Sequence, residues 1–471
     1  MDSPVTAAPK GTGLAVTAGG TLLALMAFTT PLAIVPSVAA GLRAGTVATS
    51  WILSSMSLGL AIALLTAGAI GDDFGRRRVF AWGAAVLAAG SALCGVAPNA
   101  LVFVAGRVVE GIGAAAVIAC GLALISHAFP PGPGRARATG IWGAVLGAGI
   151  AAGPVASSVI DTVIGWRYAY ALITLLAIGL TLAARFSLRE SRSGRERKID
   201  VAGSLLLGVG LGSLLAALTE GRQGWTSTLE LILIAGAVVF LAAFVLHQRQ
   251  ASGAMLDLSL FKRPALLSAT IAAFISGAGV TALMSFMGTV LERGMAHASI
   301  AASLIVLAWS ATSVVSALLT RHIPPGVPGG VKMAGGLVVV AAGLIPLAML
   351  TPHSPVWQIV AGMLVSGAGT GVVNASLGRE AVASVPPHLA GTGSGINNTS
   401  RYVGAALGVT VVTIIAVRPG TDLVSGWNAA TVTGIALSLV GAAIVFLFHR
   451  ADRAATAGSR KTAGLRKVVV S

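Results

Sequence analysis

Long apolar runs, separated by short polar connections, dominate this chain. Each run is about 20 residues or longer, the length that an α-helix needs to cross about 30 Å of hydrocarbon. The first run, from Leu14 to Ala40, is too long for a cleaved leader and contains internal prolines, so we interpret it as a span. The pattern predicts fourteen spans, at 16–40, 49–70, 79–97, 101–128, 138–160, 168–187, 201–219, 229–247, 265–291, 299–319, 331–351, 356–378, 393–416 and 427–449.

Composition identifies lipid as the solvent of most of the surface. Hydrophobic residues make up 55% of the chain, charged residues only 10%, and the mean hydropathy is +0.90. A soluble domain carries about a quarter charged residues, so we expect an all-α polytopic membrane protein. The net charge of +16 does not indicate nucleic-acid binding, because the basic residues lie in short loops and tails without a basic, aromatic-rich face.

The distribution of basic residues predicts the orientation in the membrane. An even number of spans places both termini on one side, and most Lys and Arg residues fall on that side, densest in the connection 188–198 and after residue 450. Cytoplasmic loops are enriched in Lys and Arg. We therefore expect both termini in the cytoplasm. The basic residues predicted to lie in outer loops are Arg43, Arg167, Arg222, Arg293 and Arg418.

An internal repeat divides the chain. The segment 109–113 (Val-Glu-Gly-Ile-Gly) recurs as 365–369 (Val-Ser-Gly-Ala-Gly), and the loop 129–131 (Phe-Pro-Pro) recurs as 385–387 (Val-Pro-Pro). The fourth span thus matches the twelfth, and an even shift keeps both copies in the same orientation. This predicts a six-helix bundle at 1–198, an inserted helix pair at 199–250, a second six-helix bundle at 251–450 and a basic cytoplasmic tail at 451–471.

The loop after the second span carries a spaced framework, Gly-x-x-x-Asp-x-x-Gly-Arg-Arg, formed by Gly68, Asp72, Gly75 and Arg76. Gly68 permits close helix approach and Gly75 a tight turn. Asp72 can pair with an arginine and accept from a helix N-terminus, which would form a conformational latch. An ordinary positive-inside turn explains the arginines but not the framework. The framework resembles the signature loop of the major facilitator superfamily, although Asp73 stands where that family usually has a basic residue.

The fourth span contains two charged residues at mid-membrane depth. Arg107 and Glu110 share one helix face at i and i+3. Each such charge costs about 2.5–3.5 kcal/mol unless it is paired or faces a cavity. The pair is either a structural ion pair or a proton-coupling site in which Arg107 tunes Glu110. The pattern is similar to Arg-x-x-Gln-Gly-x-Gly of the same superfamily, with Glu110 in place of glutamine.

The fifth span resembles the motif of the antiporter branch of this superfamily. Gly140, Gly149, Gly153 and Pro154 match that motif, and Gly-x-x-x-Gly steps provide a bare strip for another helix. The motif usually ends in Gly-Gly, and this chain has Ser157 and Ser158 in those two places. The branch also usually has an acidic residue and an asparagine in span one, where this chain has Ala27 and Leu32.

Together these motifs resemble the fourteen-span drug:proton antiporter branch over nearly the whole chain. The resemblance implies a major facilitator fold with 6+2+6 helices in a bacterial cytoplasmic (inner) membrane. It also implies secondary active efflux of hydrophobic or amphipathic small molecules by alternating access, in exchange for protons. Ala27 and Leu32 leave an alternative open, an uncoupled or weakly coupled exporter or flippase of a lipid or natural product. A non-transporting membrane receptor is disfavoured by the latch loop and the repeat.

Candidate substrate contacts follow from the same resemblance. Thr29, Thr30 and Asn374 lie on spans one and twelve, which line the central cavity in this superfamily. Trp142 and Trp309 are further candidates, although membrane tryptophans more often pack or lie at interfaces.

One further arginine, Arg401, lies within the thirteenth span. We expect it near the inner end of that span, as an anchor that snorkels to the interface rather than as a gating residue.

No cofactor is expected. The chain has no phosphate-binding Gly-Lys-Ser/Thr loop, no metal-spaced His/Cys cluster and no nucleophile–base pair. The expected partners are therefore the bilayer, the small-molecule substrate and protons, and we expect a monomer that is not an enzyme.

Overall fold

The computed structural model describes residues 10–192, 200–221, 227–251, 256–324, 326–418 and 420–469, and these residues form helices and connections without a strand. Fourteen helices are long and apolar enough to cross a membrane, and each predicted span falls on one of them. The predicted all-α fold with fourteen spans is confirmed.

The helices of the first half and the inserted pair follow in chain order. They are α1 (Lys10–Thr29), α2 (Pro31–Leu42), α3 (Thr46–Phe74), α4 (Arg76–Gly95), α5 (Ala100–Ala128), α6 (Pro133–Ile164), α7 (Trp166–Ser187), α8 (Val201–Glu220) and α9 (Thr228–Gln250).

The second half contains the remaining helices and several short turns. They are η1 (Leu258–Lys262), α10 (Pro264–Ser276), η2 (Gly277–Thr281), α11 (Ala282–Thr289), η3 (Val290–Gly294), α12 (Ser299–Leu319), η4 (Thr320–His322), α13 (Gly329–Leu344), η5 (Pro346–Ala348), α14 (Val356–Ala383), η6 (Pro387–Leu389), α15 (Ala390–Ala416) and α16 (Leu423–Val469). The elements α10, η2, α11 and η3 together form one span, Pro264–Gly294.

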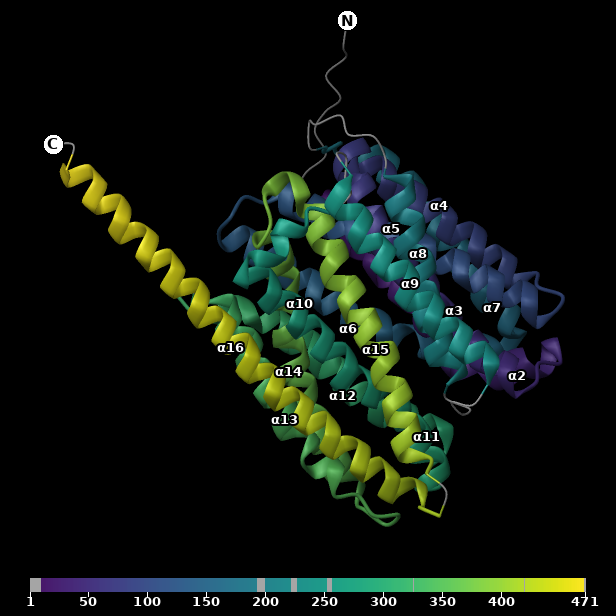
Figure 1. Cartoon of the computed structure of the whole chain (residues 1–471). Coiled ribbons are helices and arrows are strands. Elements are labelled where there is room, and N and C mark those ends of the chain that lie inside the picture. Colours follow the sequence, from purple (N-terminus) through teal and green to yellow (C-terminus); the bar gives the residue numbers. More distant parts are fainter. Residues whose placement is uncertain are drawn as a thin grey trace, which may run out of the picture.

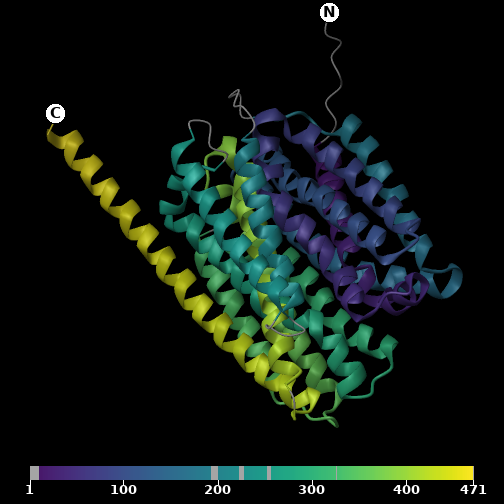
Figure 2. The same cartoon turned by 45° about the vertical axis from the view of Figure 1, so that its right-hand side comes forward.

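The early and late helices gather on opposite sides of the molecule (Figures 1 and 2). They meet where α3 and α5 pack against α15 and where α6 packs against α12 and α14. The pair α8 and α9 pack together, and α8 contacts both α3 and α15. The inserted pair therefore covers the seam between the two halves.

The two halves use glycine in equivalent ways. A Cβ on Gly111 in α5 would lie 2.3 Å from the Met56 carbonyl oxygen in α3. A Cβ on the repeat partner Gly367 in α14 would lie 2.4 Å from the Trp309 carbonyl oxygen in α12. In both halves the fourth helix thus packs backbone to backbone on the second, as the repeat predicts.

The first predicted span is wrong in one respect, because it is two helices. The helix α1 ends at Thr29 and α2 begins at Pro31. Proline has no N–H to donate to the carbonyl four residues earlier, and its ring crowds that carbonyl. The backbone oxygen of Ala27 is left without its helical partner, and the site described below depends on this oxygen.

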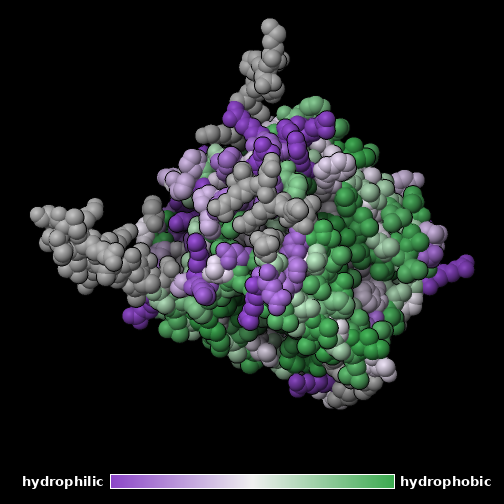
Figure 3. All heavy atoms as spheres, turned by 45° about the horizontal axis from the view of Figure 1, so that its top comes forward, coloured by the Kyte–Doolittle hydropathy of each residue, from purple (hydrophilic) through white to green (hydrophobic). Residues whose placement is uncertain are grey.

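The outer surface matches a bilayer environment. Side chains of α9 such as Leu231 and Val238 are each 64% exposed, and hydrophobic residues cover the flanks in Figure 3. Hydrophilic residues gather at one end of the molecule (Figure 3). Lipid can solvate the flanks but not this end.

Some predicted features fall on chain that the structure leaves out. The boundary at 198, with Arg195, Arg197 and Lys198, and the loop residue Arg222 lie outside the described residues. The predicted boundary at 450 falls within α16, which continues to Val469 and extends beyond the bundle in Figure 1.

Candidate functional site

The charge pair of the fourth span is completely enclosed. The side chains of Arg107 and Glu110 on α5 are each 0% exposed, and Nη1 of Arg107 lies 2.6 Å from Oε2 of Glu110. The hydroxyl of Ser91 on α4 donates to Oε1 of Glu110 at 2.5 Å. Both carboxylate oxygens therefore have a partner, as a buried charge requires.

The same arginine also binds span one. Nη1 of Arg107 donates to the backbone oxygen of Ala27 at 2.8 Å, and Nη2 donates to that of Phe28 at 3.1 Å. Ala27 is the carbonyl that Pro31 leaves without a helical donor. Arg107 thus connects Glu110 to the break between α1 and α2. The sequence signal was Pro31, four residues after Ala27, but only the fold brings Arg107 to it.

Close packing keeps water away from this pair. A Cβ on Gly90 of α4 would lie 2.5 Å from the Glu110 nitrogen. Only glycine permits this approach of α4 to α5, and any larger residue would separate the two helices. The enclosure strengthens the interaction between the two charges, because there is no solvent to screen it.

Asp72 joins the two halves at the end of the molecule that holds the N-terminus. Its Oδ1 accepts from Nη2 of Arg76 at 2.7 Å and from the backbone N–H of Gly391 at 2.9 Å. Its Oδ2 accepts from the backbone N–H of Thr392 at 2.7 Å and from the Thr392 hydroxyl at 3.0 Å. Gly391 and Thr392 open α15, so the carboxylate lies at a helix N-terminus, where the dipole favours negative charge.

Backbone approach supports this contact. A Cβ on Gly68 would lie 2.2 Å from the Gly391 carbonyl oxygen, so α3 and α15 touch without side chains between them. Gly75, with φ +116°, makes the turn that a residue with a side chain adopts only with strain. The positions of Gly68, Asp72, Gly75 and Arg76 match the geometry that a latch requires, and its opening and closing remain a prediction.

The arginine of this loop is also shared between halves. Nη2 of Arg76 donates to the backbone oxygen of Pro387 at 3.1 Å, while Nη1 donates to the Ser191 hydroxyl at 3.1 Å. Glu190 accepts from the backbone N–H of Arg77 at 3.0 Å. The contacts of Asp72 and Arg76 cross to the second half, whereas this contact of Glu190 stays within the first.

The helix with the antiporter-type motif lies against both halves. On one side, a Cβ on Gly149 or Gly153 of α6 would lie 2.6 Å or 2.5 Å from backbone oxygens of α1, those of Leu22 and Met26. On the other side, a Cβ on Gly140 would lie 3.3 Å from the Ala317 carbonyl oxygen of α12. The helix α6 runs unbroken through Pro154. At these glycines α6 presents backbone rather than side chains to both halves, which suits sliding movements.

The five candidate substrate contacts come from several elements. Thr29, the last residue of α1, and Thr30, which follows it, donate to backbone oxygens of α1, those of Leu25 and Met26, at 3.0 and 2.8 Å. Their hydroxyls are thus already engaged.

The other three candidates lie on α6, α12 and α14. Trp309 donates to the Thr370 hydroxyl at 3.2 Å within the second half. The Trp142 ring packs on Gly378 of α14, and its Nε1 has no hydrogen-bond partner. Asn374 is buried one turn before Gly378 on the same helix. Trp142 and Asn374 therefore lie near the contact of α6 with α14.

The expectation for Arg401 is wrong. It lies eleven residues after Ala390, the start of α15, which is about 16 Å along the helix axis at 1.5 Å per residue. That distance is about half of a hydrocarbon core. Arg401 is therefore deep in the bundle and does not reach an interface from the end of a helix.

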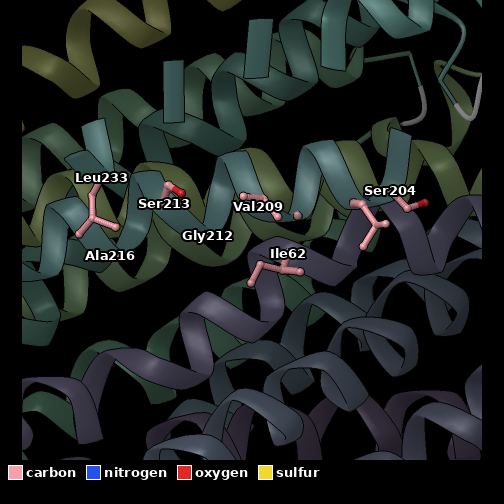
Figure 4. Close-up of a pocket in the computed structure, with 9 residues that line it drawn as sticks. Ile62, Ser204, Val209, Gly212, Ser213, Ala216 and Leu233 are labelled. Carbon is pink, nitrogen blue, oxygen red and sulfur yellow. The ribbon is translucent and has the colours of Figure 1, made fainter. Parts of the chain in front are cut away.

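A groove of about 400 Å³ opens on the flank of the molecule between α3 and the inserted pair (Figure 4). Ile62 of α3 faces Gly208 and Gly212 of α8 across it, and Leu233 of α9 closes one side. Apolar and small residues form its lining, with Ser204 and Ser213 as the hydroxyl groups. The candidate substrate residues lie elsewhere.

Metal chemistry finds no support in the described part of the chain, where no group of three or more His, Cys, Asp or Glu residues is placed to hold an ion. Glu110 and Asp72, the buried carboxylates described above, are occupied by arginine and hydroxyl or amide donors.

Comparison with known proteins gives matches over most of the chain. Residues 17–409 match the model of a family described as Major Facilitator Superfamily. The chain is 31% identical over 387 residues to "Multidrug resistance protein Stp" of Mycobacterium tuberculosis, covering 81% of this chain and 70% of that protein. It is 31% identical over 419 residues to the "Probable actinorhodin transporter" of Streptomyces coelicolor, covering 86% and 72%.

A further relative and two solved structures extend the comparison. The chain is 28% identical to "Puromycin resistance protein pur8" of Streptomyces alboniger, covering 86% of this chain and 81% of that protein. The proton:xylose symporter XylE superposes with a TM-score of 0.68 at 14% identity, covering 93% and 95%. The human organic anion transporter MFSD10 superposes with a TM-score of 0.67 at 18% identity, covering 93% and 99%. At these identities the two structures establish the fold alone.

Proposed function

This chain is a member of the major facilitator superfamily, and we propose that it exports hydrophobic or amphipathic small molecules by alternating access, in exchange for protons. Its relatives carry names of multidrug and antibiotic resistance proteins and of a transporter of a natural product. The observation that carries the coupling proposal is Glu110, a carboxylate at mid-span with no exposed surface, which shares Arg107 with the break in span one.

The contacts of Arg107 suggest how a proton would act. Ionised Glu110 holds the guanidinium, which also holds the carbonyls of Ala27 and Phe28. Protonation of Glu110 removes one charge of the pair, so Arg107 is retained less firmly between α5 and span one. The proton occupancy of Glu110 and the arrangement of α1 with α2 then depend on each other, as coupling requires.

The Asp72 contacts supply the second part of alternating access. They hold α3 against α15 and close the bundle at this end. When they break, this end opens. We assign this end to the cytoplasm of a bacterial inner membrane, with both termini inside and a single chain as the working unit, because most basic residues lie on this side of the predicted topology.

A second candidate is an uncoupled or weakly coupled exporter of a lipid or natural product. Span one lacks the acidic residue of the antiporter branch, since Ala27 and Leu32 occupy those places. The groove between α3 and α8 opens on the flank and has the apolar lining that an acyl chain requires. This candidate predicts export without accompanying proton movement.

Proton flux from purified protein in liposomes separates the two candidates. A transported compound is first identified with a deletion strain, screened against an antibiotic panel with and without a protonophore. Coupled exchange predicts that this compound drives proton flux, and that Glu110→Gln abolishes the flux while downhill movement of the compound continues. The control Glu220→Gln changes an acid at the end of α8, bound to Trp51, and should leave coupling unchanged. Export without proton flux in the wild type, or full coupling in Glu110→Gln, would refute the assignment.

A further inference from the structure

Arg401 lies in a helix that protein surrounds. The helix α15 contacts α3, α5, α8, α10, α14 and α16, and no residue of α15 from Ala390 to Thr410 is exposed. Arg401 itself is half-buried. Its charge therefore faces the interior of the bundle rather than lipid or the aqueous interface.

Within the part of the chain that the structure describes, the charge of Arg401 has no negative partner. No carboxylate of the described residues lies within ion-pair distance of Arg401, whereas Arg76 and Arg107 each bind one at 2.7 and 2.6 Å. The guanidinium carbon of Arg401 lies 5.2 Å from the centre of the Tyr402 ring, and this cation–π contact leaves the charge uncompensated. Intramembrane charges are generally retained for function, and unpaired ones face a pathway or a ligand.

The surroundings of Arg401 lie between the two halves. The Tyr402 ring packs edge-on against Phe28 of α1, with ring centres 5.9 Å apart. Three buried polar atoms of α15 within three residues of Arg401 lack a hydrogen-bond partner: Oδ1 of Asn398 and the hydroxyls of Thr399 and Tyr402. Buried polar groups without a partner are rare, and a missing ligand is one explanation of them. The aromatic rings, the Tyr402 hydroxyl and the guanidinium are thus within reach of one molecule.

We propose that Arg401 binds the anionic group of the exported compound, so that the substrates are organic anions with an aromatic or apolar body. A planar guanidinium binds a carboxylate or phenolate through paired hydrogen bonds, and the absence of water strengthens the attraction. Phe28 and Tyr402 would pack against the body, and the Tyr402 hydroxyl would donate to the anion. The proposal rests on the proposed export function and names the substrate class of the same transporter.

The charge balance of span one points the same way. Ala27 and Leu32 place no carboxylate there, and Glu110 is already neutralised by Arg107. Span one and Glu110 therefore offer a cationic compound no free negative charge, whereas Arg401 offers an anion a positive charge that no described carboxylate pairs. An anionic lipid headgroup has the same chemistry, but it resides at the interface, about 15 Å from the bilayer centre, whereas Arg401 lies at the middle of the span Pro387–Ala416.

The test uses three matched probes on the purified full chain. Fluorescence titration measures binding of 9-anthracenecarboxylate, its neutral carboxamide and the cationic 9-(aminomethyl)anthracene. The wild type should bind the carboxylate about tenfold more tightly than the amide or the amine. Arg401→Gln should remove this preference while amide binding stays within about twofold, which also reports an intact fold, and Arg401→Lys should retain part of it because the charge remains.

Four outcomes decide the proposal. Equal binding of carboxylate and amide by the wild type, or an unchanged preference in Arg401→Gln, overturns it. A carboxylate preference that disappears when phosphatidylglycerol replaces neutral lipid in the micelles also overturns it, because the site would then belong to a lipid headgroup. A preference for the carboxylate together with absent proton flux leaves this proposal standing and refutes coupled exchange, so the two can fail separately.

Discussion

At the scale of single residues, Arg107 has more partners than an ion pair needs. It binds Glu110 and also two backbone oxygens of span one. A buried ion pair contributes little net stability, because desolvation offsets the attraction, but removing one partner leaves a buried charge unpaired. The pair persists because separating its two charges would cost free energy, although the pair itself adds little stability. Such a balance suits a site whose charge changes during a transport cycle.

This asymmetry can be measured. Arg107→Met should lower the free energy of unfolding by about 3–5 kcal/mol, because Glu110 is left buried without its counter-charge. The double variant Arg107→Met with Glu110→Leu should recover a large part of that loss. Labelling of the buried free thiols Cys94 and Cys120 during denaturation follows unfolding in detergent. A double variant less stable than Arg107→Met would contradict this account.

At the scale of elements, the break in span one leaves the backbone oxygen of Ala27 without a helical hydrogen-bond donor. Pro31 ends one helix and begins the next, and α6 packs against the first of these through Gly149 and Gly153. The Ser157 hydroxyl of α6 donates to the backbone oxygen of Thr30 at 3.0 Å. The break is thus held by α5 on one side and α6 on the other, so movement of either helix reaches span one.

Restoring the missing N–H should weaken this connection. In Pro31→Ala the new amide can donate to the Ala27 oxygen in competition with Arg107 and favour a continuous helix. A single exchanged hydrogen bond is worth about 1 kcal/mol, so substrate-driven proton flux in liposomes should fall about fivefold. The matched control is Pro36→Ala, a proline inside α2. Equal effects of the two substitutions would show that the Arg107 contact is not involved.

At the scale of the whole molecule, the Asp72 contacts join the end of α3 in the first half to the start of α15 in the second. The carboxylate reaches Gly391 and Thr392, 319 and 320 residues away in sequence. Two of the three hydrogen bonds across the halves come from backbone amides at the start of α15, so the contact depends on close backbone approach.

Weakening the carboxylate should open this end. Asp72→Asn removes the negative charge from three hydrogen bonds across the halves, and a hydrogen bond to a charged group is worth about 1.5–3 kcal/mol. The equilibrium should then shift about tenfold or more towards the open form. Spin labels at the exposed residues Phe74 and Ala383, with Cys94 and Cys120 replaced by alanine, report the separation.

The control for this experiment is Glu190→Gln. It alters a carboxylate of the same loop cluster, and the contacts of Glu190 with Arg77 and Arg78 lie within the first half. The distance distribution should match that of the wild type. If Asp72→Asn leaves the distribution unchanged as well, the contact is a static one and not a latch.

The sequence by itself determined the number of spans and the pairs within helices. A long apolar run must be helical in lipid, because only a helix satisfies its own backbone groups. Residues three or four apart on a helix must be neighbours, so Arg107 with Glu110 and Asp72 with Arg76 follow from spacing alone. The family resemblance rested on the same local spacings.

Only the tertiary structure decided which helices these pairs bind. The bond from Arg107 to Ala27, the seat of Asp72 on α15 and the enclosure of Arg401 all depend on contacts between helices far apart in sequence. Hydropathy predicts that a residue is removed from water. It does not predict which helix that residue contacts, because every interior face of a membrane bundle is equally apolar. Which helices contact each other depends on close backbone packing at glycines and on helix breaks, and both take effect only once the helices have packed.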